Sequence, residues 1–437
     1  MPDTDVTNIN IIGLLFIFLM GILTILLPRR LAILPIILSA CFMTQGQTIV
    51  VLGLHFYSFR IIILIGWVRL IVRRELSPSI GLNAIDKLTI AYAVVGFAMY
   101  NLLWQTQEAF VNQLGFVYNV IGIYFLCRFL ISDLEDVERV IKISAMCSIP
   151  LAVFMIWEKL TGENIFSIFG GVPEIAYIRD DIIRSQGPFR HPILAGTFGA
   201  ATLPLVIGLW GKGRNRKLWL LLAVLSCIVI VITSASSGPA LALGGALLGL
   251  FFWFFRKYMR LILLGGLGIF ISLSLVMKAP VWFLIARVNV LSSSTGWHRA
   301  YLIDQAINRF NEWWVMGTKE TADWMPYALT SVSADITNQF IAEGLTGGML
   351  KMILFVGIIV FAFRLIGKRI RHAKNGEYLS EFEKWAIGVS LFVHIVSFFS
   401  VSYFDQIILF WYLLLAMISA LDYDSLQKKR PEEMGCA

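Results

Sequence analysis

The chain has 437 residues, of which 58% are hydrophobic and only 15% are charged. This composition excludes an ordinary soluble domain, in which apolar residues make up roughly 45 to 50% even when glycine is included. A membrane-spanning helix needs about 20 residues, so this chain can be almost entirely membrane-embedded. The 36 Lys and Arg residues exceed the 28 Asp and Glu residues, which gives a net charge of +8. We interpret this excess as membrane topology, and we expect no nucleic-acid partner.

Apolar runs of spanning length alternate with polar or Gly/Pro breaks along the whole chain. We expect helices over residues 9–27, 31–46, 51–72, 85–103, 112–131, 140–158, 191–210, 217–233, 238–255, 260–278, 346–366, 384–400 and 403–421. This pattern predicts an all-α, polytopic integral membrane helix bundle of about 12 to 13 transmembrane helices. Fusion of the second and third runs into one broken helix would give the lower number and would move the N-terminus to the other side.

The runs divide the chain into five regions. These are N-terminal transmembrane helices at 1–158, an outer loop at 159–190, central transmembrane helices at 191–278, a large periplasmic loop at 279–345, and C-terminal helices with a cytoplasmic tail at 346–437. Most Lys and Arg residues gather in alternate short connections. The positive-inside rule therefore places those connections in the cytoplasm and both long loops outside. The start, MPDTDVTN, lacks the basic residues of a signal peptide, so we expect the first run to be retained.

The cysteine and histidine patterns indicate neither a disulfide framework nor a metal site. The five cysteines are isolated, at Cys41, Cys127, Cys147, Cys227 and Cys436. We expect buried thiols that act as small hydrophobic side chains. The five histidines form no metal-ligating cluster, and we expect neither a metal nor a cofactor.

The first polar cluster, IRDDIIRSQGPFRHPILAG, covers residues 178–196 at the mouth of the seventh expected helix. It holds Arg179, Arg184 and Arg190, with a turn predicted at Gly187-Pro188, and His191 stands directly before Pro192. A planar guanidinium can bind phosphate oxygens with two parallel hydrogen bonds. The cluster therefore suggests an outer-leaflet site for a phosphorylated lipid. The alternative is that these arginines pair with nearby acids or lie at lipid headgroups as anchors.

The second polar cluster begins with GWHRAYLIDQAINRF at residues 296–310. At helical spacing, Arg299, Ile303, Ala306 and Phe310 share one face, whereas Asp304 and Asn308 share another, so we expect an amphipathic helix on the outer surface. Arg299 would then reach phosphate while its stem lies in the interface. Four tryptophans lie in this region, and we interpret them as interfacial anchors, with sugar stacking as the alternative. They are Trp297, Trp313, Trp314 and Trp324.

The stretch ADITNQFIAEGLTGGML leads into the eleventh expected helix. It places Asp335, Thr337, Asn338 and Glu343 just outside the membrane, where carboxylates and amides suit hydroxyl recognition and proton acceptance. For Thr337 and Asn338, helix capping is an equally good explanation.

Three motifs together resemble the O-antigen ligase and O-antigen polymerase family of bacterial envelope proteins. They are RSQGPFRHPILAG at 184–196, TSASSGPALAL at 233–243, and GWHRAYLID at 296–304 followed by DITNQFIAEG at 335–344. Many members have Ser-Arg-Gly where this chain has Ser236-Ser237-Gly238. Ligases typically show His-Asn where this chain has Thr337-Asn338, and this difference favours a polymerase.

The resemblance implies a metal-independent, inverting glycosyltransferase in the bacterial inner (cytoplasmic) membrane. It would transfer glycan from an undecaprenyl-diphosphate-linked oligosaccharide to a sugar hydroxyl on the periplasmic face. We assign the donor diphosphate to Arg184, Arg190 and Arg299. We expect Asp335, His191 or Glu343 to accept the proton of the acceptor hydroxyl, with Asp335 ranked first. We expect the acceptor sugar to be bound by Asn338, Asp304 and His298. Partners would be the lipid-linked donor, a sugar acceptor, the bilayer and other polysaccharide assembly proteins.

Three alternatives remain open. An O-antigen ligase would transfer the glycan to lipid A-core instead of to another repeat unit. A transporter or flippase for lipid-linked glycan would need a polar path through the bundle and often shows an inverted repeat, and the sequence indicates neither. A structural protein of an envelope assembly would leave the outer arginines unexplained.

Overall fold

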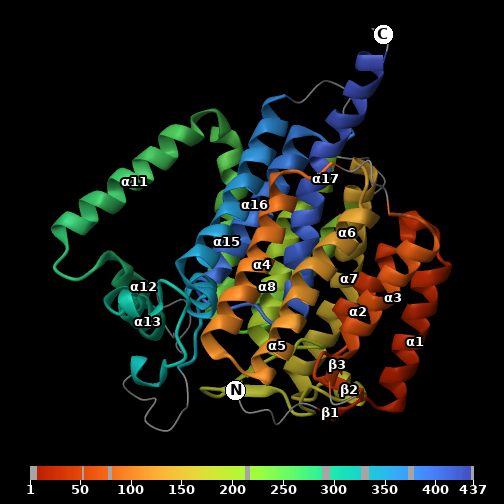
Figure 1. Cartoon of the computed structure of the whole chain (residues 1–437), viewed down its shortest axis with the longest axis horizontal. Helices are drawn as coiled ribbons and strands as arrows, with labels where there is room; N and C mark the ends of the chain where they lie inside the picture. The colour runs from red at the N-terminus through yellow and green to blue at the C-terminus, as the bar shows by residue number, and fades with distance from the viewer. Residues whose placement is uncertain are drawn as a thin grey trace.

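The computed structural model describes residues 7–51, 54–76, 81–211, 217–287, 296–325, 334–372 and 378–434. Over these residues the chain forms an all-α bundle, as expected, with two small β-sheets at one end (Figure 1). Six described helical stretches are long and apolar enough to cross a membrane. These are Ala84–Trp104, Gln107–Leu130, Leu134–Thr161, Pro192–Gly211, Ser237–Val276 and Gln339–Arg371.

The N-terminal part contains seven α-helices among the described residues. They are α1 (Ile11–Leu26), α2 (Ile33–Phe42), α3 (Ser58–Val72), α4 (Ala84–Trp104), α5 (Gln107–Val117), α6 (Tyr124–Leu130) and α7 (Leu134–Thr161). At 10 residues, α2 is about 15 Å long, which is half of a bilayer core.

The expected helix over 51–72 begins later than predicted, because its first part is a strand. Strands β1 (Thr7–Asn8), β2 (Gln47–Val51) and β3 (Leu54–Tyr57) form a sheet in that order, with β2 and β3 antiparallel. β-Branched and aromatic residues, which favour strands, dominate β2 and β3. This hairpin keeps α2 and α3 as separate helices.

The expected helix over 112–131 is part of a longer helical stretch, Gln107–Leu130, that contains a π-helical turn. The side chain of Thr106 caps the start of α5 by accepting a hydrogen bond from the backbone N–H of Ala109, so the helix begins before residue 112. A π-helical turn over Tyr118–Ile123 then separates α5 from α6. Such turns add a residue within a helix and often occur at functional sites.

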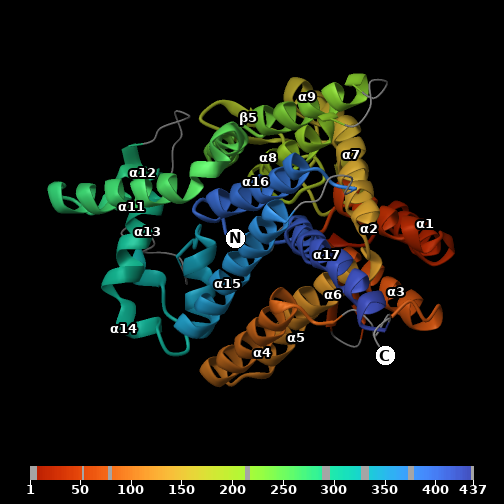
Figure 2. The ribbon, with the colours of Figure 1, turned by 90° about the horizontal axis from the view of Figure 1, so that it is seen from above.

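The central and C-terminal part contains seven longer α-helices among the described residues. They are α8 (Pro192–Gly208), α9 (Lys217–Thr233), α10 (Ser237–Phe251), α11 (Met259–Val276), α15 (Gln339–Arg371), α16 (Glu381–Phe398) and α17 (Gln406–Met434). Nearly every residue of α8 is buried, and α7, α9, α10 and α16 pack around it. By contrast, α11 has no buried residue and stands apart from the bundle (Figures 1 and 2).

The two long connections carry short elements at the end of the bundle where the sheets lie. The first holds a 3-10 helix (Ile165–Phe169) and the antiparallel hairpin β4 (Tyr177–Arg179) and β5 (Ile182–Arg184). The second holds 3-10 helices at Val281–Phe283 and Ala322–Trp324, together with α12 (Leu284–Arg287), α13 (Gly296–Asn308) and α14 (Phe310–Trp313). We call this end of the bundle the site end.

The α13 helix is amphipathic, although its buried face differs from the prediction. Arg299, Leu302 and Ala306 are buried, whereas Phe310, which was expected on the same face as Arg299, begins α14 and is 38% exposed. Trp313 and Trp324 pack with Leu302 in a small separate core and do not project as anchors. Of the five cysteines, Cys436 lies outside the described residues, and the other four are buried free thiols, as predicted.

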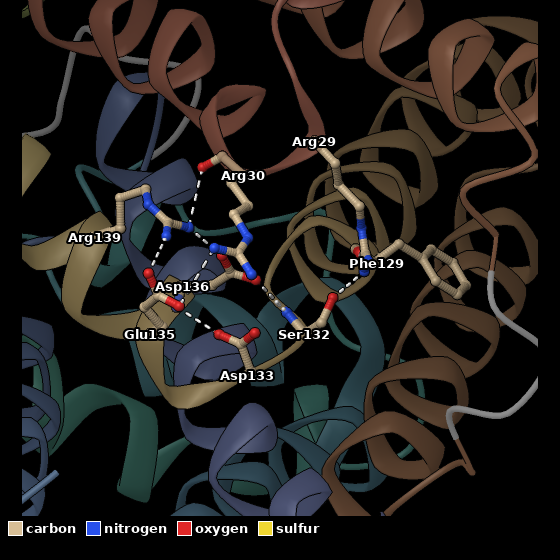
Figure 3. Close-up of polar contacts among 8 residues, drawn as sticks. All are labelled: Arg29, Arg30, Phe129, Ser132, Asp133, Glu135, Asp136 and Arg139. Atoms are coloured by element: carbon tan, nitrogen blue, oxygen red, sulfur yellow. Dashed lines mark hydrogen bonds and ion pairs between the residues drawn. The ribbon is translucent and has the colours of Figure 1, made fainter. Parts of the chain in front are cut away.

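The opposite end of the bundle carries a cluster of arginines and acids that joins a one-turn helix before α2 (Arg29–Leu31) to the start of α7 (Figure 3). Arg139 forms ion pairs with Glu135 and Asp136, and Arg30 lies 3.6 Å from Glu135. Arg29 donates to the backbone oxygen of Phe129. These contacts place the first predicted basic connection, at Arg29 and Arg30, at the end opposite to the two long loops.

Candidate functional site

A cavity of ≈ 250 Å³ lies at the site end, and we call it the cationic cavity. Its walls come from six places: the β4–β5 hairpin, the start of α8, the α9–α10 connection, α13, the segment that precedes α15 and the segment that precedes α17. The side chains that matter for its chemistry are Arg179, Arg184, His191, Arg299 and Asp335. Residues that are far apart in the sequence thus line the same cavity.

The hairpin holds two of the arginines on one face. Asp180 and Asp181 form its turn with φ angles of 51° and 59°, the left-handed conformation that suits tight hairpins. Tyr177 lies opposite Arg184, and the guanidinium carbon lies 5.4 Å from the Tyr177 ring centroid. Side chains alternate between the two faces of a strand, so Arg179 lies on the same face as Tyr177 and Arg184.

The α9–α10 connection holds the side chain of Arg184 in place. Its side chain is buried, and Nη2 donates to the Ser236 hydroxyl at 2.6 Å. The backbone continues this attachment, since the N–H of Ser185 donates to the Thr233 oxygen. The Glu158 carboxylate then accepts the backbone N–H groups of Gln186 and Gly187. The loop is therefore rigidly held, and its arginine is positioned in advance of any ligand.

His191 caps the start of α8. Its Nδ1 accepts the backbone N–H of Ile193 at 3.1 Å, and Pro192 occupies the first helical position, where its missing N–H costs nothing. Burial, followed by the Arg184 and Arg179 charges, lowers the pKa of His191 from 6.5 to about 4. The imidazole is thus neutral near pH 7 with its proton on Nε2. His191 lines the cationic cavity, and its Nε2–H can donate a hydrogen bond there, while its proposed role as a proton acceptor stays a prediction.

Arg299 is the least compensated charge of the cavity. It is 6% exposed, and its Nε has no hydrogen-bond partner among the described residues. Burial, and secondarily the Arg179 charge, lowers the pKa of Arg299 to about 10. Within the described part of the chain, no carboxylate forms an ion pair with it. Such a group normally requires an anionic partner, because an unpaired buried charge is costly.

The balance of charge in the cavity is positive. Arg179, Arg184 and Arg299 line it, whereas Asp335 is the one carboxylate among the described lining residues. Arg179 lies 3.9 Å from Asp180, but both side chains are more than one third exposed, so this pair neutralises little. Burial, and then the Arg179 charge, lowers the pKa of Arg184 as well. An anion in the cavity would relieve all of these penalties.

Asp335 lies in an extended segment just before α15, with its side chain exposed. Its backbone oxygen contacts Nε2 of His298 at 3.0 Å, which ties this segment to α13. The neighbouring Thr337 also lines the cavity, and its hydroxyl has no described partner. A carboxylate beside three guanidiniums can accept a proton from a hydroxyl that approaches the bound anion.

Five other residues from the sequence hypothesis do not line the cationic cavity. Arg190 points toward Asp405 at 3.9 Å instead. Asn338 caps α15 by accepting the N–H of Ile341. Asp304 accepts hydrogen bonds from Trp282 and Asn308. Glu343 lies within α15 and forms a buried ion pair with Lys351. His298 is close to the cavity, but it holds the Asp335 backbone and does not line the space.

From the sequence, Arg190 and not Arg179 was assigned to the donor diphosphate. In the structure Arg179 lines the cationic cavity, whereas Arg190 lies near Asp405. The signal that could have found Arg179 is the two-residue Asp180-Asp181 turn, because a tight hairpin there sets Arg179 and Arg184 on one face. Tyr177 follows from the same register. The hydrogen bond from Arg184 to Ser236 depends on tertiary packing, and no local sequence pattern predicts it.

No protein-family model matches the sequence, and no curated protein matches it. Over the described residues, no group of three or more His, Cys, Asp or Glu side chains converges in a way that could hold a metal ion.

Proposed function

We propose that this protein is a membrane glycosyltransferase that uses a lipid diphosphate as the leaving group of its sugar donor. The donor would be an undecaprenyl-diphosphate-linked oligosaccharide, and the acceptor a sugar hydroxyl. The product would be a polymer of exopolysaccharide or O-antigen repeat units, as the resemblance to O-antigen polymerases and ligases implies. One observation carries this proposal: the buried and unpaired Arg299 faces a cavity with two further arginines and a single carboxylate.

The transfer requires one bond to form as another breaks. The acceptor oxygen attacks the anomeric carbon of the donor sugar while the bond between that carbon and the diphosphate oxygen breaks. The leaving diphosphate takes the electron pair of that bond, and the acceptor proton passes to the Asp335 carboxylate. Attack from the side opposite the leaving group inverts the anomeric configuration.

The arginines would stabilise the charge that develops on the departing diphosphate. Guanidinium groups held in a partly desolvated site act more strongly than they would in water, and they need no reorganisation during the reaction. Arg184 is already held by Ser236, and Arg299 is free to take a phosphate oxygen. The Nε2–H of His191 supplies a further neutral donor at the same wall.

The topology follows from the same proposal. The site end would face the periplasm of a bacterial cell, and the cluster of Figure 3 would face the cytoplasm. Besides the six long apolar stretches, the shorter apolar helices Ile11–Leu26, Lys217–Thr233 and Gln406–Asp422 would contribute passes in this orientation. Nucleotide sugars are absent from that compartment, so a lipid-linked donor is the chemistry that fits it.

A ligase would use the same donor chemistry and differ only in its acceptor. Thr337 stands where ligases of the resembled family typically carry histidine, and this difference favours polymerisation. Transfer to lipid A-core is the outcome that would reverse this choice.

One observation favours a second function, a transporter for lipid-linked glycan. Glu343 and Lys351 form an ion pair, 2.9 Å apart, inside the helix bundle, although the sequence suggested no such polar group there. Buried charges within membrane helices commonly mark transport paths. However, the pair lies in the first half of α15, toward the site end, so it does not by itself make a path through the bundle.

Purified protein in liposomes separates these functions. Lipid-linked oligosaccharide is supplied on the side that faces the site end, and the glycan is then analysed for length, attachment and sidedness. We expect longer glycan on the same lipid. Glycan on a different acceptor would identify a ligase, and unaltered glycan on the far side would identify a transporter. The Arg299→Ala variant should give no product, whereas Arg309→Ala, which removes the partner of Asp323 on the surface, should behave as wild type.

A further inference from the structure

A second cavity of ≈ 360 Å³ lies between α4, α5, α15 and α17. Figure 2 shows α4 and α5 side by side, with α15 and α17 next to them. The cavity is lined by four amide side chains, those of Asn112, Gln113, Asn119 and Gln339, and we call it the amide-lined cavity. Its size falls within the range of about 300 to 1,000 Å³ that is typical of small-molecule sites.

The charged groups of this cavity cancel each other. Lys351 lies 2.9 Å from Glu343, and their side chains are only 5% and 6% exposed. Gln339 donates to the other oxygen of Glu343, and Lys351 donates to the Thr346 hydroxyl at 2.7 Å. The amide-lined cavity therefore has no excess of either charge, in contrast to the cationic cavity.

The remaining lining suits a polar but uncharged ligand. Gln113 is 5% exposed, and its Oε1 has no hydrogen-bond partner among the described residues. An amide can both accept and donate hydrogen bonds, as sugar hydroxyls can. Aromatic rings supply flat apolar faces beside these amides. They belong to Tyr92, Tyr100, Phe116, Phe355, Phe398, Tyr403, Trp411 and Tyr412.

The two cavities share a wall. Ser402 lines both of them, and its hydroxyl donates to the Ile336 oxygen at 2.9 Å. The next residue, Tyr403, donates its backbone N–H to the Gln339 side chain. The partition between the cavities thus consists of a short loop and the segment that precedes α15, which also carries Asp335.

We propose that the amide-lined cavity binds an uncharged sugar ring of the acceptor glycan, next to the diphosphate that occupies the cationic cavity. The assignment of this sugar to the acceptor rests on the proposed function, whereas its binding follows from the lining alone. A hydrocarbon chain would leave Gln113 and the neighbouring amides without partners, which is costly when they are buried. A free anion would meet the carboxylate of Glu343 directly.

Photocrosslinking in the native membrane tests this site. A benzophenone amino acid replaces Tyr100, which lines the amide-lined cavity, or Phe404, which lines the cationic cavity. The control replaces Phe110, which lies on α5 and is 47% exposed. After irradiation, the purified protein is digested and its adducts are analysed by mass spectrometry for sugar residues.

We expect sugar-bearing adducts at position 100 and none at position 110. Adducts at position 100 that carry only hydrocarbon, or no adduct there while position 404 gives lipid-linked glycan, would overturn the inference and leave the proposed function intact. If the liposome assay shows no transfer and position 100 still captures glycan, the proposed function fails and the sugar site stands.

A kinetic comparison covers the case in which the crosslinking variants do not fold. Gln113→Ala removes one hydrogen bond to the sugar and should raise the KM for the acceptor by about 2- to 10-fold, with little change in the KM for the donor. Gln107→Ala, on the exposed side of α5, is the matched control and should match wild type. An unchanged acceptor KM in Gln113→Ala, or an equal rise in the donor KM, would contradict the inference.

Discussion

Replacement of Arg299 by methionine should strongly lower the rate of transfer and make the unliganded protein more stable. Methionine keeps the long stem that packs within α13, but it removes a buried guanidinium that has no anionic partner among the described residues. The lowered pKa of Arg299, caused by burial and by the Arg179 charge, shows that the folded state disfavours the charged form. An anionic ligand that pairs with Arg299 would compensate the cost of burying its charge, and this would explain why an arginine occupies the position.

The expected size of both effects follows from the geometry. Loss of one partner from a buried charge pair costs about 2 to 5 kcal/mol, which corresponds to a drop of about 30- to 5,000-fold in kcat/KM. Replacement of buried ionic groups by apolar side chains often stabilises a fold by about 1 to 4 kcal/mol. Arg299→Lys keeps the charge but loses the paired hydrogen bonds, so we expect a loss of about 10- to 150-fold.

The assay combines turnover in liposomes with thermal unfolding in detergent for the same preparations. Arg309→Ala provides the control, because Arg309 pairs with the exposed Asp323 on the surface and lies outside the cavity. An Arg299→Met protein that is less stable than wild type and still active would refute the reasoning. Such a result would mean that Arg299 serves the packing of α13 and not a ligand.

Three further predictions concern the rest of the site. Asp335→Asn should lower kcat by about 100- to 10,000-fold, as expected for loss of a general base, whereas Asp304→Asn should have little effect. Near-wild-type turnover of Asp335→Asn would exclude Asp335 as the proton acceptor. His191→Asn keeps a capping side chain and removes the titration. The folded pKa of His191, about 4, lies below the usual 6.5, so the folded state is destabilised as the pH falls from 6.5 to 4. The variant should lose less stability than wild type across that window, and parallel unfolding curves would contradict this. Burial raises the pKa of Asp405 to about 6, against the Arg190 and Arg60 charges, so Arg190→Ala should raise that pKa further. Asp405→Asn should then recover stability in the Arg190→Ala background, and a double variant no more stable than Arg190→Ala would show that the pair is not coupled.

The helices could be predicted from sequence because each one is a long apolar run, and burial of such runs dominates local preferences. The exceptions have specific causes. The hairpin of β2 and β3 is as apolar as its neighbours, so hydropathy alone cannot separate it from α3. The π-helical turn at Tyr118–Ile123 depends on one extra residue in a helix, which leaves the hydrophobic pattern almost unchanged.

The candidate site could be predicted only as far as topology places residues at the same end of the bundle. Arg184, His191, Arg299 and Asp335 come together because the β4–β5 hairpin, the start of α8, α13 and the segment before α15 all lie at the site end. The direction of each side chain decides whether it lines the cavity, and this direction cannot be predicted from the neighbouring residues in the sequence. Arg190 is adjacent to His191 but points to Asp405, which is far away along the chain.

The amide-lined cavity shows a different limit of sequence reasoning. Lys351 lies within an apolar run, and Glu343 lies before it, so neither residue suggests a partner by itself. A break in α15 brings them together, since Gly347 and Gly348 leave the helical conformation between them. The left-handed φ of Gly348, 73°, and the closeness of the Val315 backbone would disfavour any side chain at this position.

The central claim is that the cationic cavity binds a lipid diphosphate, and a direct binding measurement tests it. The affinity of the purified protein is measured for undecaprenyl diphosphate and for undecaprenol, which lacks both phosphates, with wild type and with Arg299→Ala. We predict that wild type binds the diphosphate much more tightly than the alcohol and that Arg299→Ala loses this difference. Equal affinity of wild type for the two lipids, or an unchanged preference in Arg299→Ala, would contradict the account.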